Sequence, residues 1–347
     1  MLLSELSIET KTLHAELMER LAVREAQRTI GNLDGSFSTK TIAGQEYLYF
    51  QHYTAGGGKR SICLGQKSAR LEKLIDLYRS ERLENAEDPI GIDELCAQLK
   101  AGRIATTPHP VARVIRELAD SSVFRVGGVL VGTHAFACIG NLLGVRWDET
   151  TLGTLDVDVA AERTVSIAVS GLKADIPKAL ESLAMGFFPV PRLNPKHPST
   201  TFAIRKSPLR VDLLTPKTDQ NEYPVFIPRL NAAAQPLSHL DYLIEDPIPG
   251  AVINGGAIAV LVPQPLKFGL HKMIISQLRD CTSGAKAEKD LYQAHQILSY
   301  FDRERRYELQ RSWQDLLNRG GAWKKRALAG LAALYKKYDS LNSMPLN

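Results

Sequence analysis

Hydrophobic and polar residues change their pattern twice along the chain. In residues 1–30, Leu, Met and Ala fall on one helical stripe. Short apolar runs alternate with helical patterns between about 120 and 216, and nearly everything from Pro265 onward has helical spacing. Strand-like runs that alternate with helices predict a mixed α/β domain. We therefore expect three regions: an N-terminal helical region at 1–110, an α/β core at 111–220, and a C-terminal hairpin and helical domain at 221–347.

The same patterns predict the individual elements. Strands are expected at 124–131, 154–160, 164–171, 200–206 and 209–216, with a further hairpin at 251–263. Helices are expected at about 68–84, 92–101, 108–120, 133–144 and 176–187. The core is then a mixed sheet flanked by helices.

The N-terminal region contains an expected hairpin at 45–65, in which two strand-like runs flank a Gly-rich turn. Its "GGGKR" lacks the spacing of a phosphate-binding P-loop and the Ser or Thr that follows the P-loop lysine. The aromatic and basic side chains of the hairpin could stack against nucleic acid or could simply pack the small sheet. These are Tyr47, Tyr49, Phe50, Tyr53, Lys59 and Arg60.

The composition is that of an ordinary soluble protein, with 44% hydrophobic and 23% charged residues in 347. No apolar run approaches the roughly 18–20 residues of a membrane span. The first twenty residues carry acids where a signal peptide needs a basic flank. The sequence thus predicts a cytoplasmic protein without a membrane segment. The widely spaced cysteines predict reduced thiols rather than disulfides or a zinc site: Cys63, Cys96, Cys138 and Cys281.

The net charge of +5 is concentrated near the C-terminus. Residues 302–339 hold ten Arg or Lys against five acids, so this segment alone accounts for the excess. A basic helical tail is typical of contact with nucleic acid or nucleotide phosphates. A solvated helix face with charge pairs four residues apart explains the same pattern.

The segment "TLDVDVA" places two acids in an apolar strand. Asp156 and Asp158 are two residues apart, so their side chains share one face of the strand. Two carboxylates there repel each other and resist burial unless a cation lies between them. A third acid, Asp212, lies in the apolar strand "LRVDLL". Oxygen ligands of this kind suit Mg²⁺ or Mn²⁺, so the sequence predicts a metal site.

A Gly-Thr pair ends one predicted strand and begins a helix. The free N–H groups of a helix N-terminus bind phosphate, and glycine lets the backbone approach it closely. Gly132 and Thr133 are therefore candidate phosphate-binding residues, and His134 follows them closely enough to contact a bound nucleotide.

These motifs, in this order, resemble the nucleotidyltransferase superfamily of DNA polymerase β. The resemblance implies that Gly132 and Thr133 lie beside the phosphates. It also implies that Asp156, Asp158 and Asp212 bind Mg²⁺ or Mn²⁺ and act in catalysis. Thr133 departs from the usual Gly or Ser, and the gap to Asp156 is longer than the family norm.

Residues 120–300 also resemble bacterial predicted nucleotidyltransferases and the AbiEii-type toxin transferases. The matching C-terminal residues are Lys272 and the pair Lys289-Asp290. The resemblance implies that both lysines bind the nucleotide, and it suggests an antitoxin-like partner. Each lysine could instead face solvent or pair with Asp290, and His271 is as consistent with packing as with a site role.

The sequence thus predicts an enzyme that moves a nucleoside monophosphate from an NTP, such as ATP, to a hydroxyl. The toxin resemblance favours an RNA or tRNA 3′ end as acceptor, with protein and small-molecule acceptors open. The alternative is a non-catalytic nucleotide- or nucleic-acid-binding protein on the same fold. A third interpretation is that the chain is a DNA-binding partner protein that uses the aromatic hairpin and the basic tail. It is compatible with both the enzyme and the non-catalytic interpretation.

Overall fold

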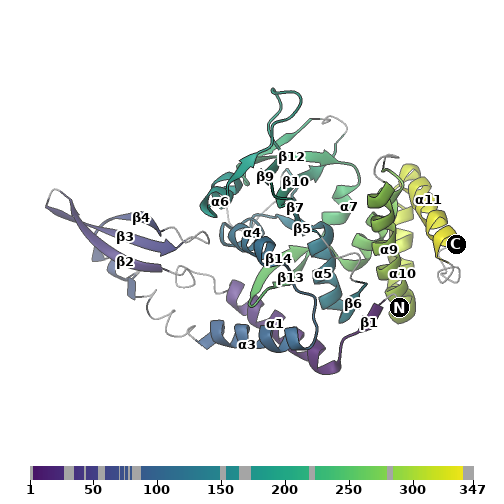
Figure 1. The fold of residues 1–347 in the computed structure, drawn as a ribbon, viewed down its shortest axis with the longest axis horizontal. Coiled ribbons are helices and arrows are strands. Elements are labelled where there is room, and N and C mark those ends of the chain that lie inside the picture. The colour runs from purple at the N-terminus through teal and green to yellow at the C-terminus, as the bar shows by residue number, and fades with distance from the viewer. Residues whose placement is uncertain are drawn as a thin grey trace.

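The structure is a computed structural model of the 347-residue chain. It describes residues 3–26, 35–42, 44–53, 59–69, 71–73, 75, 76, 79, 87–148, 154–163, 173–218, 223–279 and 284–338. A central sheet lies between an N-terminal region and a group of C-terminal helices (Figure 1).

Seven strands form the central mixed sheet. Its main path runs β11-β12-β10-β7-β5, and β9 pairs with both β10 and β8. β7, β10 and β12 are parallel, whereas β5, β9 and β11 run antiparallel to their neighbours. The strands are β5 (Val129–Val131), β7 (Asp156–Ala160), β8 (Phe187–Pro189), β9 (Thr201–Ile204), β10 (Arg210–Pro216), β11 (Val225–Ile227) and β12 (Ala232–Leu237).

Alternation along β7 and β10 separates an apolar face from a polar face. Val211 and Leu213 of β10 are buried, as are Val157 and Val159 of β7, while the residues between them are less buried. Because side chains alternate across a strand, the acids of both strands fall on the face opposite these apolar residues.

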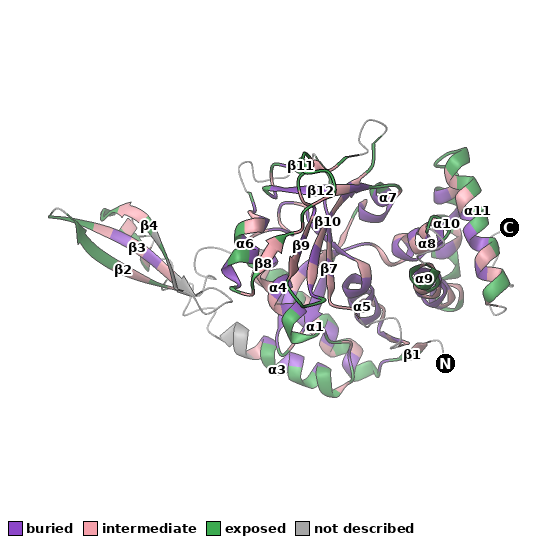
Figure 2. Cartoon of the chain, turned by 45° about the horizontal axis from the view of Figure 1, so that its top comes forward, coloured by how far each residue is buried: buried purple, intermediate pink, exposed green. Residues whose placement is uncertain are grey.

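Helices and a hairpin cover the sheet. Helix α5 is buried along most of its length and lies between the sheet and the C-terminal helices (Figures 1 and 2). Its Phe136 stacks on Trp147 and on Phe268 of α8 (Pro265–Ser276). The covering elements are α4 (His109–Asp120), α5 (Gly132–Leu143), α6 (Ile176–Ser182), α7 (Leu240–Ile244), β13 (Ile248–Ile253) and β14 (Ala257–Val262).

The C-terminal helices belong to the same hydrophobic core as the sheet. Their buried residues include Phe268, Ile297, Trp313 and Leu334, one from each helix. The helices are α8 (Pro265–Ser276), α9 (Gly284–Glu304), α10 (Arg306–Leu317) and α11 (Gly321–Lys337).

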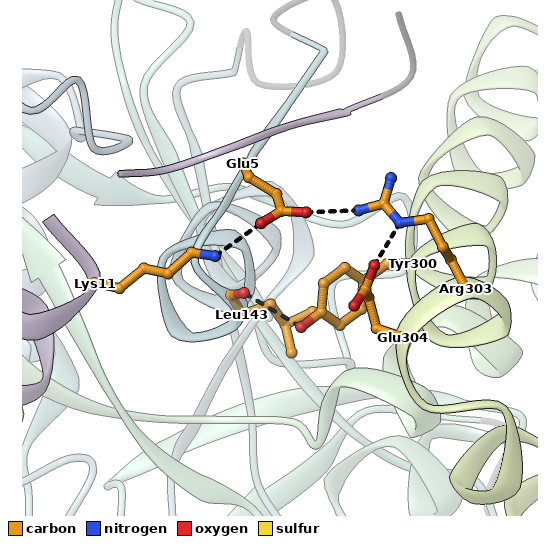
Figure 3. A network of polar contacts seen from close by, with 6 residues as sticks. All are labelled: Glu5, Lys11, Leu143, Tyr300, Arg303 and Glu304. Carbon is orange, nitrogen blue, oxygen red and sulfur yellow. Dashed lines mark hydrogen bonds and ion pairs between the residues drawn. The ribbon is translucent and has the colours of Figure 1, made fainter. Parts of the chain in front are cut away.

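The N-terminal region attaches to this core in two ways. β1 (Leu3–Glu5) pairs with β6 (Val145–Trp147), and α1 (Ile8–Ala26) packs with α3 (Glu87–Ala101) in a smaller second core. Figure 3 shows a further link, in which Glu5 pairs with Lys11 and with Arg303 of α9.

A three-stranded antiparallel sheet forms an arm that projects from the body, away from α9–α11 (Figure 1). Its strands are β2 (Gly35–Ile42), β3 (Gln45–Tyr53) and β4 (Lys59–Gln66). The expected hairpin corresponds to β3 and β4, and β2 adds a third strand that the sequence interpretation did not include.

The predicted fold class, a mixed α/β core with an N-terminal helix-and-strand region and helical C-terminal region, is confirmed. The strand expected at 124–131 is shorter, because it begins only at Val129. Ser122 and Gly127 have φ of 67° and 89°, which favours turns before it. The strand expected at 164–171 lies outside the described residues, as does much of the helix expected at 68–84.

In the described part of the chain, no helix combines the length and the apolar character that crossing a membrane requires. Cys63, Cys96 and Cys138 are free thiols, and Cys281 falls outside the described residues.

Candidate functional site

A pocket of about 290 Å³ opens between the polar face of the sheet and the helices α8 and α9. Its residues come from five places: the β5–α5 junction, β7, β10, the β12–α7 segment, and the α8–α9 region. The lining comprises Val131, Gly132, Thr133, Thr154, Asp156, Asp158, Arg210, Asp212, Leu214, Leu237, Leu240, Leu243, His271, Lys272, Ile275, Arg279, Lys286, Lys289 and Asp290.

The three predicted acids lie together on the sheet wall of this pocket. Asp158 of β7 and Asp212 of β10 are register partners on parallel strands. Neighbouring strands are about 4.8 Å apart, so the two carboxylates face the same space. Asp156 lies two residues before Asp158, on the same face. The sequence prediction that the acids converge agrees with this geometry.

Arg210 lies among the acids, and the sequence interpretation missed it. Its guanidinium is 3.1 Å from Oδ2 of Asp156 and 3.1 Å from Oδ2 of Asp212. Arg210 is the register partner of Asp156 and lies two residues before Asp212, so all three side chains share one face. The spacing Arg-x-Asp in the sequence indicates that Arg210 and Asp212 share a face of β10. It does not indicate that Arg210 meets Asp156, because that contact depends on the register between β7 and β10.

The environment of Asp158 disfavours a charged carboxylate. Burial raises its pKa to about 6, and the charges of Asp212 and Asp156 push in the same direction. Lys272 and Arg210 oppose the shift without overcoming it. A further cation near Asp158 would therefore stabilise its charged form.

The donor set fits a hard divalent cation by its chemistry. The three acids offer only oxygen ligands, which Mg²⁺ and Mn²⁺ prefer, and both burial and the charges of Asp212 and Asp156 raise the pKa of Asp158. In the present side-chain arrangement, however, no three His, Cys, Asp or Glu residues among those described form a ready-made metal site. Arg210 occupies oxygens of two acids, so a bound ion would compete with it.

Hydroxyl and backbone groups fix the acid wall. The hydroxyl of Thr201 on β9 donates to Oδ1 of Asp212 at 2.5 Å. Gly132 lies against Asp158 from the other side, because its neighbour Val131 is the register partner of Asp158. Gly132 has φ of 70°, and an added Cβ would overlap Oδ2 of Asp158. Only glycine meets both conditions without strain.

The N-terminus of α5 opens into the pocket. Val131 at the cap position is extended, and no side chain caps the helix. Gly132 and Thr133 both line the pocket. The N–H groups of this first turn are therefore a suitable site for a phosphate oxygen.

The helical wall carries the opposite charge. Lys272, Arg279, Lys286 and Lys289 all line it, with Asp290 as the acid among them. Burial lowers the pKa of Lys289, and the neighbouring charge of Lys272 lowers it further. An acidic wall thus faces a basic wall across one small pocket.

The pocket residues lie within a segment that matches a known protein family. The sequence profile of a family described as "Nucleotidyltransferase" matches residues 109–318, more than half of the chain. The chain belongs to this nucleotidyltransferase family. The matched segment contains every residue that lines the pocket.

One solved structure is similar at a low level, an antigenic nucleotidyltransferase-like protein from Paracoccidioides brasiliensis. It shares 14% identity with a TM-score of 0.37, over 69% of this chain and 93% of that chain. Likeness at this level does not establish a shared fold. No curated protein matches the sequence.

Two histidines differ in their relation to the site of this nucleotidyltransferase-family chain. His134, predicted to contact nucleotide, is 3% exposed within α5 and does not belong to the pocket lining. His271 does line it. Burial lowers the pKa of His134 to about 4 and that of His271 to about 3, so both imidazoles are neutral at pH 7.

The first turn of α11 lies next to the pocket edge. Trp323 packs edge-on against His239, with ring centroids 4.3 Å apart. His239 immediately precedes Leu240, which lines the pocket. Lys324 and Lys325 of the same turn are exposed.

The arm is separate from the pocket lining. Phe50 is 2% exposed and packs on Phe37. Of the two alternatives left open by the sequence, this contact corresponds to packing within the small sheet. Tyr47 and Tyr49 are partly exposed on the opposite face, where Lys40 lies 4.7 Å from the ring of Tyr49. The side chains of Tyr53, Lys59 and Arg60 lie outside the described part.

Proposed function

We propose that this protein transfers a nucleoside monophosphate from an NTP to a hydroxyl acceptor in the pocket described above. The observation that carries the proposal is the opposition of the two walls. Three acids on β7 and β10 face Lys272, Lys289 and their neighbours, with the α5 N-terminus at one side. An acidic wall suits cation-assisted chemistry, and a basic wall suits a polyphosphate.

In such a reaction, different groups of pocket residues would have different roles. The basic wall would bind and orient the polyphosphate, and the N–H groups of the first turn of α5 would hold one phosphate oxygen. Asp156 and Asp158 of β7, together with Asp212 of β10, would hold Mg²⁺ or Mn²⁺. When bound, such an ion neutralises phosphate charge and favours loss of a proton from the attacking hydroxyl. Thr201 would keep the carboxylate of Asp212 oriented.

A second candidate function is nucleotide binding without catalysis. The observation that favours it is Arg210, which already supplies a cation to Asp156 and Asp212. In that case the guanidinium permanently takes the place of a metal ion.

Substitution of Arg210 distinguishes the two functions. We expect Arg210→Gln to raise the affinity for Mn²⁺, in the absence of nucleotide, by about tenfold, equivalent to about 1.4 kcal/mol, because a competing positive charge is removed. The affinity is measured by electron paramagnetic resonance of free Mn²⁺. Arg205→Gln, at a site outside the pocket lining, is the control. Measurable Mn²⁺ binding by the wild type as well would favour transfer, whereas Mn²⁺ binding by Arg210→Gln alone would favour the non-catalytic function, in which the guanidinium takes the place of the metal ion.

The acceptor is tested by a labelling screen. Each NTP, labelled at the α-phosphorus, is incubated with the protein and either total RNA or lysate, with and without Mg²⁺ or Mn²⁺. We propose an RNA 3′ end, as in the AbiEii-type resemblance, since basic α11 lies beside the pocket edge. Label that enters only proteins or small molecules would contradict the RNA acceptor while leaving transfer itself intact.

The basic first turn of α11 provides a specific test of the RNA acceptor. We expect a Lys324→Gln, Lys325→Gln, Arg326→Gln variant to bind RNA more weakly and with a shallower salt dependence, because up to three phosphate contacts are lost. Binding is measured by fluorescence anisotropy between 50 and 200 mM salt. Neutralising Lys336 and Lys337, at the other end of α11, provides the control. A triple variant that labels RNA as well as wild type would show that this turn is only a solvated helix surface.

A further inference from the structure

Asp290 is a buried acid that binds two cations at once. Asp290 is 3% exposed and lies in the second turn of α9. Oδ1 accepts a hydrogen bond from Nζ of Lys272 at 2.6 Å, and Oδ2 accepts two from Arg279, at 2.9 Å and 2.7 Å. Lys272 lies on α8 and Arg279 follows the end of α8. One carboxylate therefore orients two cations from a neighbouring element.

The carboxylate of Asp290 is held in its charged form. Burial would raise its pKa, but the charges of Lys272 and Arg279 outweigh burial and lower it. The cluster thus carries two positive charges and one negative charge, and the excess positive charge faces the pocket, because all three residues line it.

Both cations keep donors that Asp290 does not use. A lysine ammonium has three N–H donors, of which Asp290 takes one, and a guanidinium has five, of which Asp290 takes two. The side chain of Arg279 is 34% exposed, against 12% for Lys272. Arg279 is thus the more accessible of the two, with its planar fork fixed in direction.

A purely structural ion pair explains this arrangement poorly. A buried pair contributes little net stability, because desolvation offsets the attraction between the charges. One cation would also be enough to compensate one acid. The second cation leaves a net positive charge in the pocket, beside Lys286 and Lys289, and an anion of high charge density would complete the cluster.

We propose that Asp290 is a positioning residue that holds Lys272 and Arg279 as a clamp, and that Arg279 binds the polyphosphate of the nucleotide directly. This inference rests on the proposed function, since it names a further ligand of the same NTP. Arg279 was not among the site residues expected from the sequence, because only the fold brings it to Asp290.

The clamp is tested by direct binding rather than by turnover. Isothermal titration calorimetry measures the Kd of the full chain for inorganic tripolyphosphate without divalent metal and, separately, for ATP with Mg²⁺. The variants are Arg279→Gln, Asp290→Asn and the double variant. The matched control is Arg306→Gln, which removes the same charge from an exposed i,i+4 pair with Asp302. Thermal unfolding verifies that each variant is folded.

We expect Arg279→Gln to weaken binding of both ligands by about 10- to 100-fold, the effect of losing charge-assisted hydrogen bonds. Asp290→Asn should weaken both as well, and by a smaller factor in the Arg279→Gln background than in wild type. A structural role for Asp290 would lower the unfolding temperature without this non-additivity. The control should bind as wild type does.

The outcomes separate the clamp from the proposed function. Wild-type affinity in Arg279→Gln, or additive effects of the two substitutions, would overturn the clamp, as would a wild-type protein that binds neither ligand. If both ligands bind as predicted but no labelled nucleotide is transferred under any condition, the clamp holds and nucleotidyl transfer is wrong.

Discussion

We expect Asp158→Asn to abolish nucleotidyl transfer while making the metal-free protein more stable. The substitution preserves shape but removes the charge at the centre of the acid wall. Loss of a preorganised electrostatic group costs on the order of 10³-fold in rate. The control is Asp93→Asn, on the exposed side of α3 and away from the pocket lining.

The predicted gain in stability follows from the sign of the pKa shift. The pKa of Asp158 is raised by burial, and then by Asp212, from 3.8 to about 6 in the folded protein. Well below pH 3.8 the group is protonated in both folded and unfolded states, so it adds no penalty. Above pH 6 it is charged in both, and the folded state carries the full penalty. Asn should therefore raise the free energy of unfolding by about 3 kcal/mol at pH 8 and by almost nothing at about pH 3.

Urea unfolding of both proteins, without divalent metal, at pH 8 and at the lowest pH at which both remain folded measures this difference. A variant that loses transfer and also loses stability at pH 8 would indicate a structural role for Asp158. Retained transfer at the wild-type rate would show that the acid is not catalytic.

The second large effect is expected at Gly132. Gly132→Ala should reduce transfer by about 100-fold, because a shift of about 1 Å in a catalytic group has that cost. The reason is steric: the new Cβ would overlap the carboxylate of Asp158. The positive φ of 70° adds strain of about 1–3 kcal/mol to the folded state.

Gly186→Ala separates strain from displacement of Asp158. Gly186 has a comparable φ of 80°, and an added Cβ there meets no atom within 4 Å. We expect it to lower the unfolding temperature in the same way as Gly132→Ala while transfer per folded molecule stays at the wild-type level. Equal transfer by both variants would contradict the close contact between Gly132 and Asp158.

Most of the acid wall, and the glycine beside it, could be predicted from local patterns in the sequence. Two acids spaced by two residues in an apolar strand must share a face, and a Gly-Thr pair after a buried strand marks a helix start. The structure has both features, at β7 and at the start of α5. The division at residues 110 and 220 remains a prediction.

The missing parts of the site depend on tertiary contacts. Arg210 meets Asp156 only through the register of β7 with β10, which no local pattern specifies. Arg279 meets Asp290 because α8 and α9 pack together, across an intervening segment. His134 is buried next to the pocket and outside its lining, although the charges of Lys289 and Asp156 act on it, so its contact with the nucleotide remains a prediction.

The central claim is that the pocket transfers a nucleoside monophosphate. The most direct measurement compares ATP labelled at the α-phosphorus with ATP labelled at the γ-phosphorus, in wild type and Asp158→Asn, with Mg²⁺ or Mn²⁺ and the acceptor found by the labelling screen. We predict that wild type attaches only the α-label and releases one pyrophosphate for each label attached, and that Asp158→Asn attaches neither. Attachment of the γ-label, or equal α-labelling by Asp158→Asn, would contradict the account.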